Sequence, residues 1–284
     1  MVAMPRTMAL LKDGGANMSN FFVHTPICCP SRTTMLSGKY QHNNRVSLYP
    51  QNKQPGCMRQ NTSQKDNPAW WQRSFVKSLH DAHFTTGLFG KTLNSWNSYG
   101  CDNSSGMADG IDRQLVMCDH NFFNQHWIND TTGTFTGSKP EDYTTSVMGN
   151  ATVRWVESVL AQGPTHPPFF VWLGPHAPHP PATPAPWYAD HPIGKIQAPR
   201  GDPYYNYSAL DHHEILAKQP IINDADAAAI DVEYAKRLRS LLSVDDIVDA
   251  LHALLVKAGE WDRTFFFVST PQHARTHLPR SIST

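Results

Sequence analysis

The hydrophobic pattern of the chain switches repeatedly between two periods. Apolar residues spaced three or four apart predict amphipathic helices, and short uninterrupted apolar runs predict buried strands. The predicted helices cover residues 4–13, 30–38, 71–82, 143–160, 224–239 and 244–257. The predicted strands cover residues 20–23, 84–90, 169–173 and 264–269.

Helices and strands alternate in this order, which is typical of a parallel sheet covered by helices on both faces. We therefore predict a single α/β domain with a mostly parallel central sheet. Residues 97–138 contain many turn-forming residues and little periodicity, so they are predicted to form an extended surface excursion.

Three of the predicted strands end next to chemically reactive side chains. Cys28 follows the first strand, Lys91 follows the second, and His176 and His179 follow the third. The carboxyl ends of parallel strands meet at one edge of a sheet, where open α/β folds bind their ligands. A thiol, an amine and imidazoles are therefore expected to meet in one active site.

The charge balance excludes one class of function. The chain has 284 residues, with 24 Lys+Arg and 24 Asp+Glu, so its formal net charge is zero. A general nucleic-acid-binding protein normally carries a basic surplus, so no nucleic acid partner is expected. No apolar run approaches the roughly 20 residues that a membrane-spanning helix needs, so no membrane span is expected.

Glycosylation motifs indicate the secretory pathway. N-x-S/T triplets without a central proline occur at Asn17, Asn61, Asn103, Asn129, Asn150 and Asn206. Their number favours a glycoprotein that is lysosomal or extracellular. The first residues show no signal peptide, so the natural amino terminus is expected to lie upstream of Met1.

The five cysteines leave one thiol to explain in a secretory protein. The adjacent pair Cys28 and Cys29 has a redox or metal-binding interpretation, but no second C-x-x-C or zinc-spaced cluster supports it. Cys101 and Cys118 flank the same predicted excursion and are candidates for a disulfide.

Residues 28–38 read C-C-P-S-R-T-T-M-L-S-G and match the sulfatase signature C-x-P-S-R-x-x-x-L-x-G. The chain therefore resembles the sulfatase family, above all the N-acetylglucosamine-6-sulfatases and the extracellular glucosamine-6-sulfatases. The resemblance continues through the stretches 24–43, 88–94, 177–188 and 236–251. It implies an alkaline-phosphatase-like α/β sandwich with the central sheet flanked by helices.

In this family the first cysteine of the motif is oxidised to formylglycine, so Cys28 is the expected nucleophile position. The implied partners are the formylglycine-generating enzyme and a sulfated glycan or sulfated amino sugar. The implied reaction is removal of sulfate from an N-acetylglucosamine-6-sulfate-like sugar. One hydroxyl of the hydrated aldehyde would attack sulfur, and the other would then eject sulfate and regenerate the aldehyde.

The resemblance also implies catalytic roles for three further residues. Arg32 lies one helical turn after Cys28 and would hydrogen-bond the modified side chain or neutralise nearby charge. Lys91 matches the lysine that contacts sulfate and assists the leaving group, with a solvated surface lysine as the alternative. His179 matches the general acid–base histidine, a role that suits an imidazole titrating near neutrality.

Three more residues are candidates for substrate binding. Asn94 and His213 stand where similar proteins carry the same residue types, and an ordinary structural role is equally open for both. His176 is interpreted either as a substrate-contacting residue or as a structural or rim histidine.

Sulfatases of this type hold a divalent cation, usually Ca²⁺, with carboxylate ligands and the modified cysteine, here Cys28. The resemblance places one aspartate pair after a strand upstream of Met1. It places the second pair where this chain has Thr270 and Pro271. We therefore predict an incomplete N-terminal catalytic domain over residues 1–269 that lacks its first strand and most metal ligands. An unrelated tail would occupy 270–284, with no C-terminal subdomain, so we expect the chain to be truncated at both ends.

Two other functions are weighed against an active sulfatase. A catalytically inactive relative would bind sulfated glycans through Arg32, Lys91 and the histidines without turnover. A phosphatase of the same superfamily would use Ser or Thr and a zinc site, which the C-C-P-S-R motif contradicts. The proline-rich stretch 164–186 has a rival interpretation as a polyproline II ligand, but it follows a buried strand and contains His179.

Overall fold

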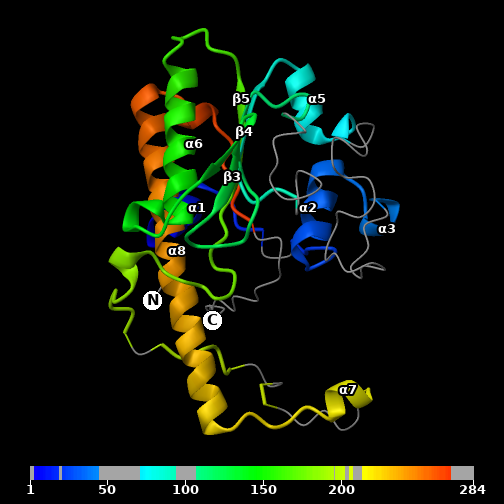
Figure 1. The fold of residues 1–284 in the computed structure, drawn as a ribbon, viewed down its shortest axis with the longest axis vertical. Coiled ribbons are helices and arrows are strands. Elements are labelled where there is room, and N and C mark those ends of the chain that lie inside the picture. The colour runs from blue at the N-terminus through cyan, green and yellow to red at the C-terminus, as the bar shows by residue number, and fades with distance from the viewer. Residues whose placement is uncertain are drawn as a thin grey trace, which may run out of the picture. The chain divides into compact units, whose positions relative to one another are not determined.

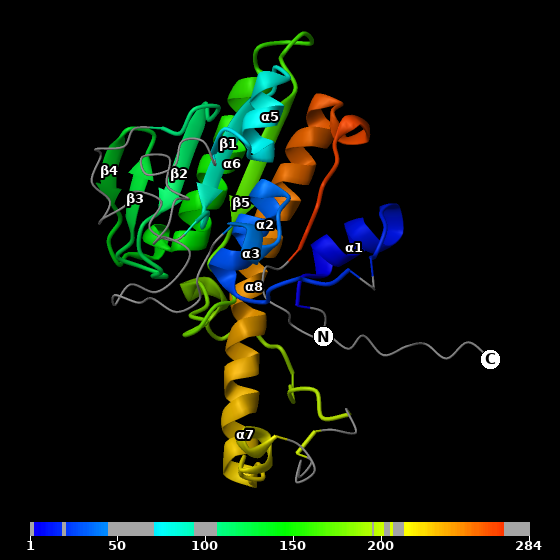
Figure 2. The same ribbon diagram turned by 90° about the vertical axis from the view of Figure 1, so that its right-hand side faces the viewer.

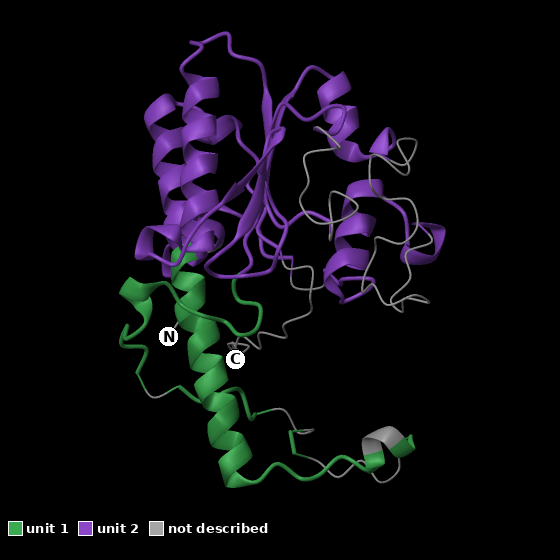
Figure 3. Cartoon of the chain, viewed as in Figure 1, with its two compact units in different colours: residues 1–3, 177–243, 275–284 green, residues 4–176, 244–274 purple. Residues whose placement is uncertain are grey.

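The computed structural model describes residues 3–18, 21–44, 71–93, 107–194, 196–201, 205–206 and 213–269. The chain divides into two compact units (Figure 3). One unit comprises residues 4–176 and 244–274, and the other comprises residues 1–3, 177–243 and 275–284. We call them the sheet unit and the second unit.

The strands are β1 (Thr85–Gly90), β2 (Arg113–Met117), β3 (His126–Asn129), β4 (Thr132–Phe135) and β5 (Phe169–Gly174). The α-helices are α1 (Pro5–Gly14), α2 (Cys28–Ser37), α3 (Gln41–Asn44), α5 (Phe75–Asp81), α6 (Thr144–Leu160), α7 (Glu214–Ala217) and α8 (Asp224–Ala258). Short 3₁₀ turns lie at Pro140–Asp142, Pro186–Tyr188 and Trp261–Arg263.

The five strands form one mixed sheet in the order β4-β3-β2-β1-β5 (Figure 2). Its centre is parallel, because β1 pairs in parallel with both β2 and β5. An antiparallel hairpin of β3 and β4 extends the β2 side. The last residue of β1, Gly90, lies opposite Val116 of β2 and Gly174 of β5, so the carboxyl ends of the three parallel strands are level.

Helices cover both faces of the sheet (Figure 1). On one face, Leu88 of β1 packs with Cys29 of α2 and Val76 of α5. On the other face, the next residue, Phe89, packs with Met148 of α6. Successive strand residues point to opposite faces, so a short apolar strand serves both cores. Each fully buried side chain of this size contributes about 1.5–3 kcal/mol. The predicted α/β sandwich is therefore confirmed.

Most of the predicted elements are confirmed within a few residues. The helix predicted at 30–38 is α2, the helix predicted at 143–160 is α6, and the strands predicted at 84–90 and 169–173 are β1 and β5. The helix predicted over 71–82 begins later, at Phe75, after Ser74 caps it by accepting a hydrogen bond from the Lys77 amide at 3.2 Å.

The prediction of a surface excursion over 97–138 is wrong, because this stretch contains β2, β3 and β4. Polar residues inside these strands conceal them in the sequence. Gln114 of β2 is fully buried, and its side-chain amide donates to the Asp130 carbonyl at 2.6 Å. A buried polar residue with a satisfied hydrogen bond breaks the apolar pattern without breaking the strand.

Three other predictions are corrected. Residues 21–23 of the predicted first strand are irregular, and the two helices predicted over 224–257 are the single helix α8, 35 residues long.

The predicted strand 264–269 pairs with no described strand. Phe265 and Phe267 are 90% and 78% exposed, and Phe266 between them packs inward near Trp261. Alternation along an extended segment explains why only one of the three rings is covered.

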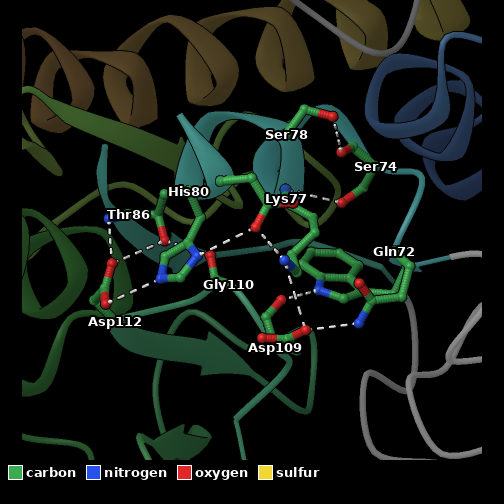
Figure 4. Close-up of polar contacts among 11 residues, drawn as sticks. Gln72, Ser74, Lys77, Ser78, His80, Thr86, Asp109, Gly110 and Asp112 are labelled. Atoms are coloured by element: carbon green, nitrogen blue, oxygen red, sulfur yellow. Dashed lines mark hydrogen bonds and ion pairs between the residues drawn. The ribbon is translucent and has the colours of Figure 1, made fainter. Parts of the chain in front are cut away.

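A polar cluster ties α5 to the segment that leads into β2 (Figure 4). Lys77 lies 3.7 Å from the Asp109 carboxylate, and the Thr86 amide donates to the Asp112 carboxylate at 2.8 Å. Because Thr86 is the second residue of β1, this cluster lies at the opposite end of that strand from Lys91. We assign it a structural role.

Candidate active site

Helix α2 presents Cys28 and Arg32 at the edge of the sheet unit. Cys28 is its first residue, and Pro30 fits the first turn, where a missing N–H costs no helical hydrogen bond. Gly38 ends the helix in a left-handed conformation (φ +65°), and its N–H donates to the Thr34 carbonyl at 2.9 Å. Arg32 follows Cys28 by one turn, so both side chains lie on one side of α2.

The adjacent cysteines differ in chemical state. Cys29 is buried and Cys118 is half-buried, and both are disulfide-bonded. Cys28 is half-buried and forms no disulfide. The thiol in the sulfatase motif is therefore not committed to a disulfide. Cys101, the partner predicted for Cys118, lies outside the described residues.

Two glycines place Lys91 directly after β1. Gly90 has φ +82°, and a Cβ there would lie 2.4 Å from the Gly174 carbonyl oxygen. A Cβ at Gly174 would lie 2.2 Å from the Lys91 carbonyl oxygen. The Lys91 amide donates to the Gly174 carbonyl at 2.7 Å, and the Trp172 indole donates to the Lys91 carbonyl at 3.2 Å. These contacts fix the Lys91 backbone between β1 and β5.

Burial changes the charge chemistry of both cations. Arg32 is 3% exposed, and its desolvation lowers the pKa of the guanidinium to about 10, although Cys28 opposes this shift. Lys91 is 8% exposed, and its pKa is lowered to about 8. Desolvation is the main cause, the positive charge of Arg32 adds to it, and Cys28 again opposes it. The three groups therefore act on one another electrostatically.

Two buried, mutually repelling cations are the arrangement that a bound anion stabilises. The amino end of α2 adds the partial positive charge of the helix dipole at Cys28. Residue 28 and the two cations can thus hold an oxyanion such as sulfate.

The described residues of this site do not fit a calcium ion. Nowhere in the described chain do three or more His, Cys, Asp or Glu side chains gather as a metal site. The charged groups beside Cys28, Arg32 and Lys91, are positive, which disfavours a cation. The predicted positions Thr270 and Pro271 lie outside the described residues.

The predicted histidines lie in different places. His176, two residues after β5, is 2% exposed and packs against Phe122 at 4.8 Å and against His120 at 5.8 Å between ring centroids. His179 belongs to the second unit, and its Nδ1 lies 2.8 Å from the Pro180 carbonyl oxygen.

The remaining predicted substrate contacts gain no support from their positions. His213 also belongs to the second unit, where it is exposed and its carbonyl accepts the Ala217 amide in the turn of α7 at 3.1 Å. Asn94 lies outside the described residues.

His120 is a candidate that the sequence analysis missed. It follows β2, the strand hidden in the supposed excursion, so it was not assigned to a strand end. A strand prediction for residues 113–117 would have placed it at the same edge of the sheet as Lys91 and His176.

The predicted glycosylation sites differ in accessibility. Asn17 and Asn150 are exposed, whereas Asn129 is half-buried at the end of β3. The Asn129 side-chain oxygen is buried.

Asn206 is engaged in a local clamp. Its side-chain amide donates to the Ile222 carbonyl at 2.9 Å, and its oxygen accepts from the Ile222 amide at 2.6 Å. Attachment of a glycan would disturb this pair of bonds. The other two motifs, at Asn61 and Asn103, lie outside the described residues.

The second unit contains a depression of about 420 Å³ that serves as a contrast. Arg200 and Tyr205 line it, but the Asp231 carboxylate lies 2.8 Å from the Arg200 guanidinium. That cation is therefore neutralised by an acid of its own unit.

Replacing Gly174 by alanine is expected to destabilise the protein by about 2 kcal/mol or more, because the added Cβ would collide with the Lys91 carbonyl. Chemical denaturation measures this loss, and displacement of Lys91 would also weaken anion binding. Gly201→Ala is the control, since nothing lies within 4 Å of a Cβ there. Unchanged stability and binding in Gly174→Ala would contradict the assigned contact.

The family model described as Sulfatase matches residues 2–270. The chain belongs to the sulfatase family. It is 28% identical over 281 residues to an extracellular sulfatase SULF-1 homolog of Drosophila melanogaster. This alignment covers 95% of this chain and 23% of the relative. It is 27% identical over 285 residues to the N-acetylglucosamine-6-sulfatase of Homo sapiens, covering 95% of this chain and 48% of the relative. This sulfatase chain thus spans about a quarter to a half of the length of these relatives.

Solved structures support the same fold. One protein, determined in complex with its substrate D-glucosamine-2-N,6-O-disulfate, aligns with a TM-score of 0.59 at 16% identity. The alignment covers 92% of this sulfatase chain and 58% of that protein. A protein of Bacteroides fragilis described as a sulfatase aligns with a TM-score of 0.58 at 14% identity, covering 91% of this chain and 54% of that protein. These alignments support the alkaline-phosphatase-like fold. In the described part of the chain, no helix is both long and apolar enough to cross a membrane.

Proposed function

We propose that this chain carries the catalytic centre of a sulfuric ester hydrolase that removes sulfate from a sulfated sugar of the N-acetylglucosamine-6-sulfate type. The observation that carries the proposal is the pair of buried cations, Arg32 and Lys91, which interact electrostatically with Cys28, a cysteine outside any disulfide. Sulfated sugars also occur in the names and substrates of the relatives.

Cys28 fits the position of a formylglycine, because it is the first residue of α2, lies inside the motif and forms no disulfide. Hydrated formylglycine would supply a hydroxyl nucleophile and a second hydroxyl whose deprotonation releases sulfate. Arg32 would orient residue 28 and share the negative charge of the ester through charge-assisted hydrogen bonds.

Lys91 would bind the sulfate oxygens and assist the departing sugar oxygen. With a pKa of about 8, the Lys91 amine is mostly protonated at neutral pH. A bound sulfate would raise that pKa and keep the ammonium charged. His179 is our candidate for the general acid–base, since an imidazole can donate and accept a proton near neutral pH.

The proposed partners are the formylglycine-generating enzyme during synthesis and a sulfated glycan as substrate. The proposed location is the lysosome or the extracellular space, with N-linked glycans on the protein. We assign no catalytic step to Ca²⁺, because the described residues offer it no suitable ligands.

Sulfate release from N-acetylglucosamine 6-sulfate tests the proposal. The protein is produced with the converting enzyme, and free sulfate is measured by ion chromatography with and without Ca²⁺. Steady release that requires both Cys28 and Lys91 is the expected result. Binding of the sugar without any release would favour a non-catalytic glycan-binding protein. Absence of both binding and release would overturn the proposal.

A further inference from the structure

We propose that His120, stacked on His176, forms a subsite for a second sulfate group of the substrate, next to the site of the scissile ester. The assignment rests on the proposed function, because it concerns the same substrate. Four features of the sheet unit support it.

The first feature is topology. β2 and β5 lie on opposite sides of β1, and their carboxyl ends are level with Gly90. His120 follows β2 and His176 follows β5, yet their rings stack at 5.8 Å with an interplanar angle of 23°. The two rings therefore meet across the carboxyl end of β1, where Lys91 begins.

The second feature is the fixed loop that carries His120. The loop begins at the disulfide-bonded Cys118, whose amide donates to the His126 carbonyl at 3.0 Å. The Thr144 hydroxyl donates to the Asn121 carbonyl at 2.8 Å.

Packing of the Phe122 side chain also holds the loop that carries His120. Phe122 is 4% exposed and stacks on the fully buried Tyr143 at 6.0 Å. The exposed His120 ring is thus presented by a rigid support, which a binding residue needs.

The third feature is the protonation pattern. His120 Nδ1 lies 2.9 Å from the Asp119 carbonyl oxygen, which can only accept, so Nδ1 carries a hydrogen. Nε2 then becomes a second donor when the ring is protonated. A sulfate beside it favours the protonated form.

The fourth feature is the local charge. The Asp119 carboxylate is engaged by His126, whose Nδ1 lies 2.5 Å away. The Asp119 charge beside His120 is therefore paired with His126, and the His176 ring stacks on the His120 ring. Because Lys91 follows the adjacent strand β1, the carboxyl-end edge of the sheet favours binding of anions.

The test compares two probes, glucosamine 6-O-sulfate and glucosamine 2-N,6-O-disulfate, by calorimetric titration of the full chain. His120→Phe keeps an aromatic ring against His176 and removes both N–H donors. We expect the wild type to prefer the disulfate, and the variant to lose roughly tenfold in affinity for the disulfate only. His83→Asn is the control. His83 is exposed, has φ 66° and precedes β1 at the opposite edge of the sheet.

Three results would overturn the assignment. Equal affinity of the wild type for both probes would leave the proposed function intact and remove the second subsite. An equal loss for both probes in His120→Phe would indicate a structural role for His120. Failure of the wild type to bind either probe would overturn the proposed function together with this subsite.

Discussion

Replacing Lys91 by methionine is expected to raise the thermal stability of the protein and to remove its affinity for sulfated sugars. Methionine has similar length and no charge, so it relieves the desolvation of the amine and its repulsion by Arg32. The same change deletes a buried charged contact to the ligand. Such losses cost about 2–5 kcal/mol, so affinity should fall roughly 30-fold to several thousand-fold.

The pH dependence provides a second signature of this lysine. Its pKa is lowered from 10.5 to about 8 in the folded protein, so the unfolded chain binds the proton more tightly. The wild type should therefore gain stability as the pH rises from about 8 towards 10.5, and Lys91→Met should lack this gain. Sulfate should stabilise the wild type at pH 7 and progressively less above the folded pKa.

Differential scanning calorimetry with and without sodium sulfate measures both effects. Lys39→Met is the matched control, because Lys39 is exposed just after α2. A Lys91→Met variant that melts lower than the wild type and still responds to sulfate would refute the assignment of Lys91 to an anion site.

Cys28→Ala is expected to abolish sulfate release while leaving substrate binding within about threefold. Loss of a nucleophile can lower kcat by about a million-fold. Arg32 and Lys91 remain in this variant, so the anion site persists. The two quantities are measured by ion chromatography of sulfate and by calorimetric titration of N-acetylglucosamine 6-sulfate.

Met35→Ala is the control for this experiment, because Met35 lies on the exposed side of α2 and is 45% exposed. Sulfate release by Cys28→Ala near the wild-type rate would show that residue 28 is not the nucleophile. A parallel collapse of binding would instead indicate that Cys28 supports the fold of α2.

The parts of the fold that followed from the sequence are those with uninterrupted apolar patterns. β1, β5 and α6 are apolar runs or regular stripes, and their periodicity is visible without tertiary information. β2 was hidden because Gln114 is buried with its hydrogen bonds satisfied by a distant residue, Asp130. No local pattern reveals such a partner.

At residues 264–269, by contrast, a buried strand was predicted where the structure has none. Their apolar composition favours a buried strand, but strand formation also requires a neighbouring strand, and composition does not reveal one. In the described structure, Phe265 and Phe267 are exposed.

In the candidate site, too, some features were visible in the sequence and others depend on the tertiary structure. The motif around Cys28 and Arg32 was visible in the sequence, because sulfatases share it as a contiguous string. The burial of Lys91 and the close approach of Gly90 and Gly174 are tertiary facts that no spacing encodes. His120 was missed because its assignment depended on β2.

The central claim is that residue 28 is the modified nucleophile of a sulfatase. Mass spectrometry of the peptide containing residue 28, from protein produced with the formylglycine-generating enzyme, tests this claim most directly. The account predicts that Cys28 has lost its sulfur and reacts as an aldehyde with a hydrazide probe, while Cys29 keeps its sulfur. An intact thiol at Cys28 under these conditions would contradict the claim.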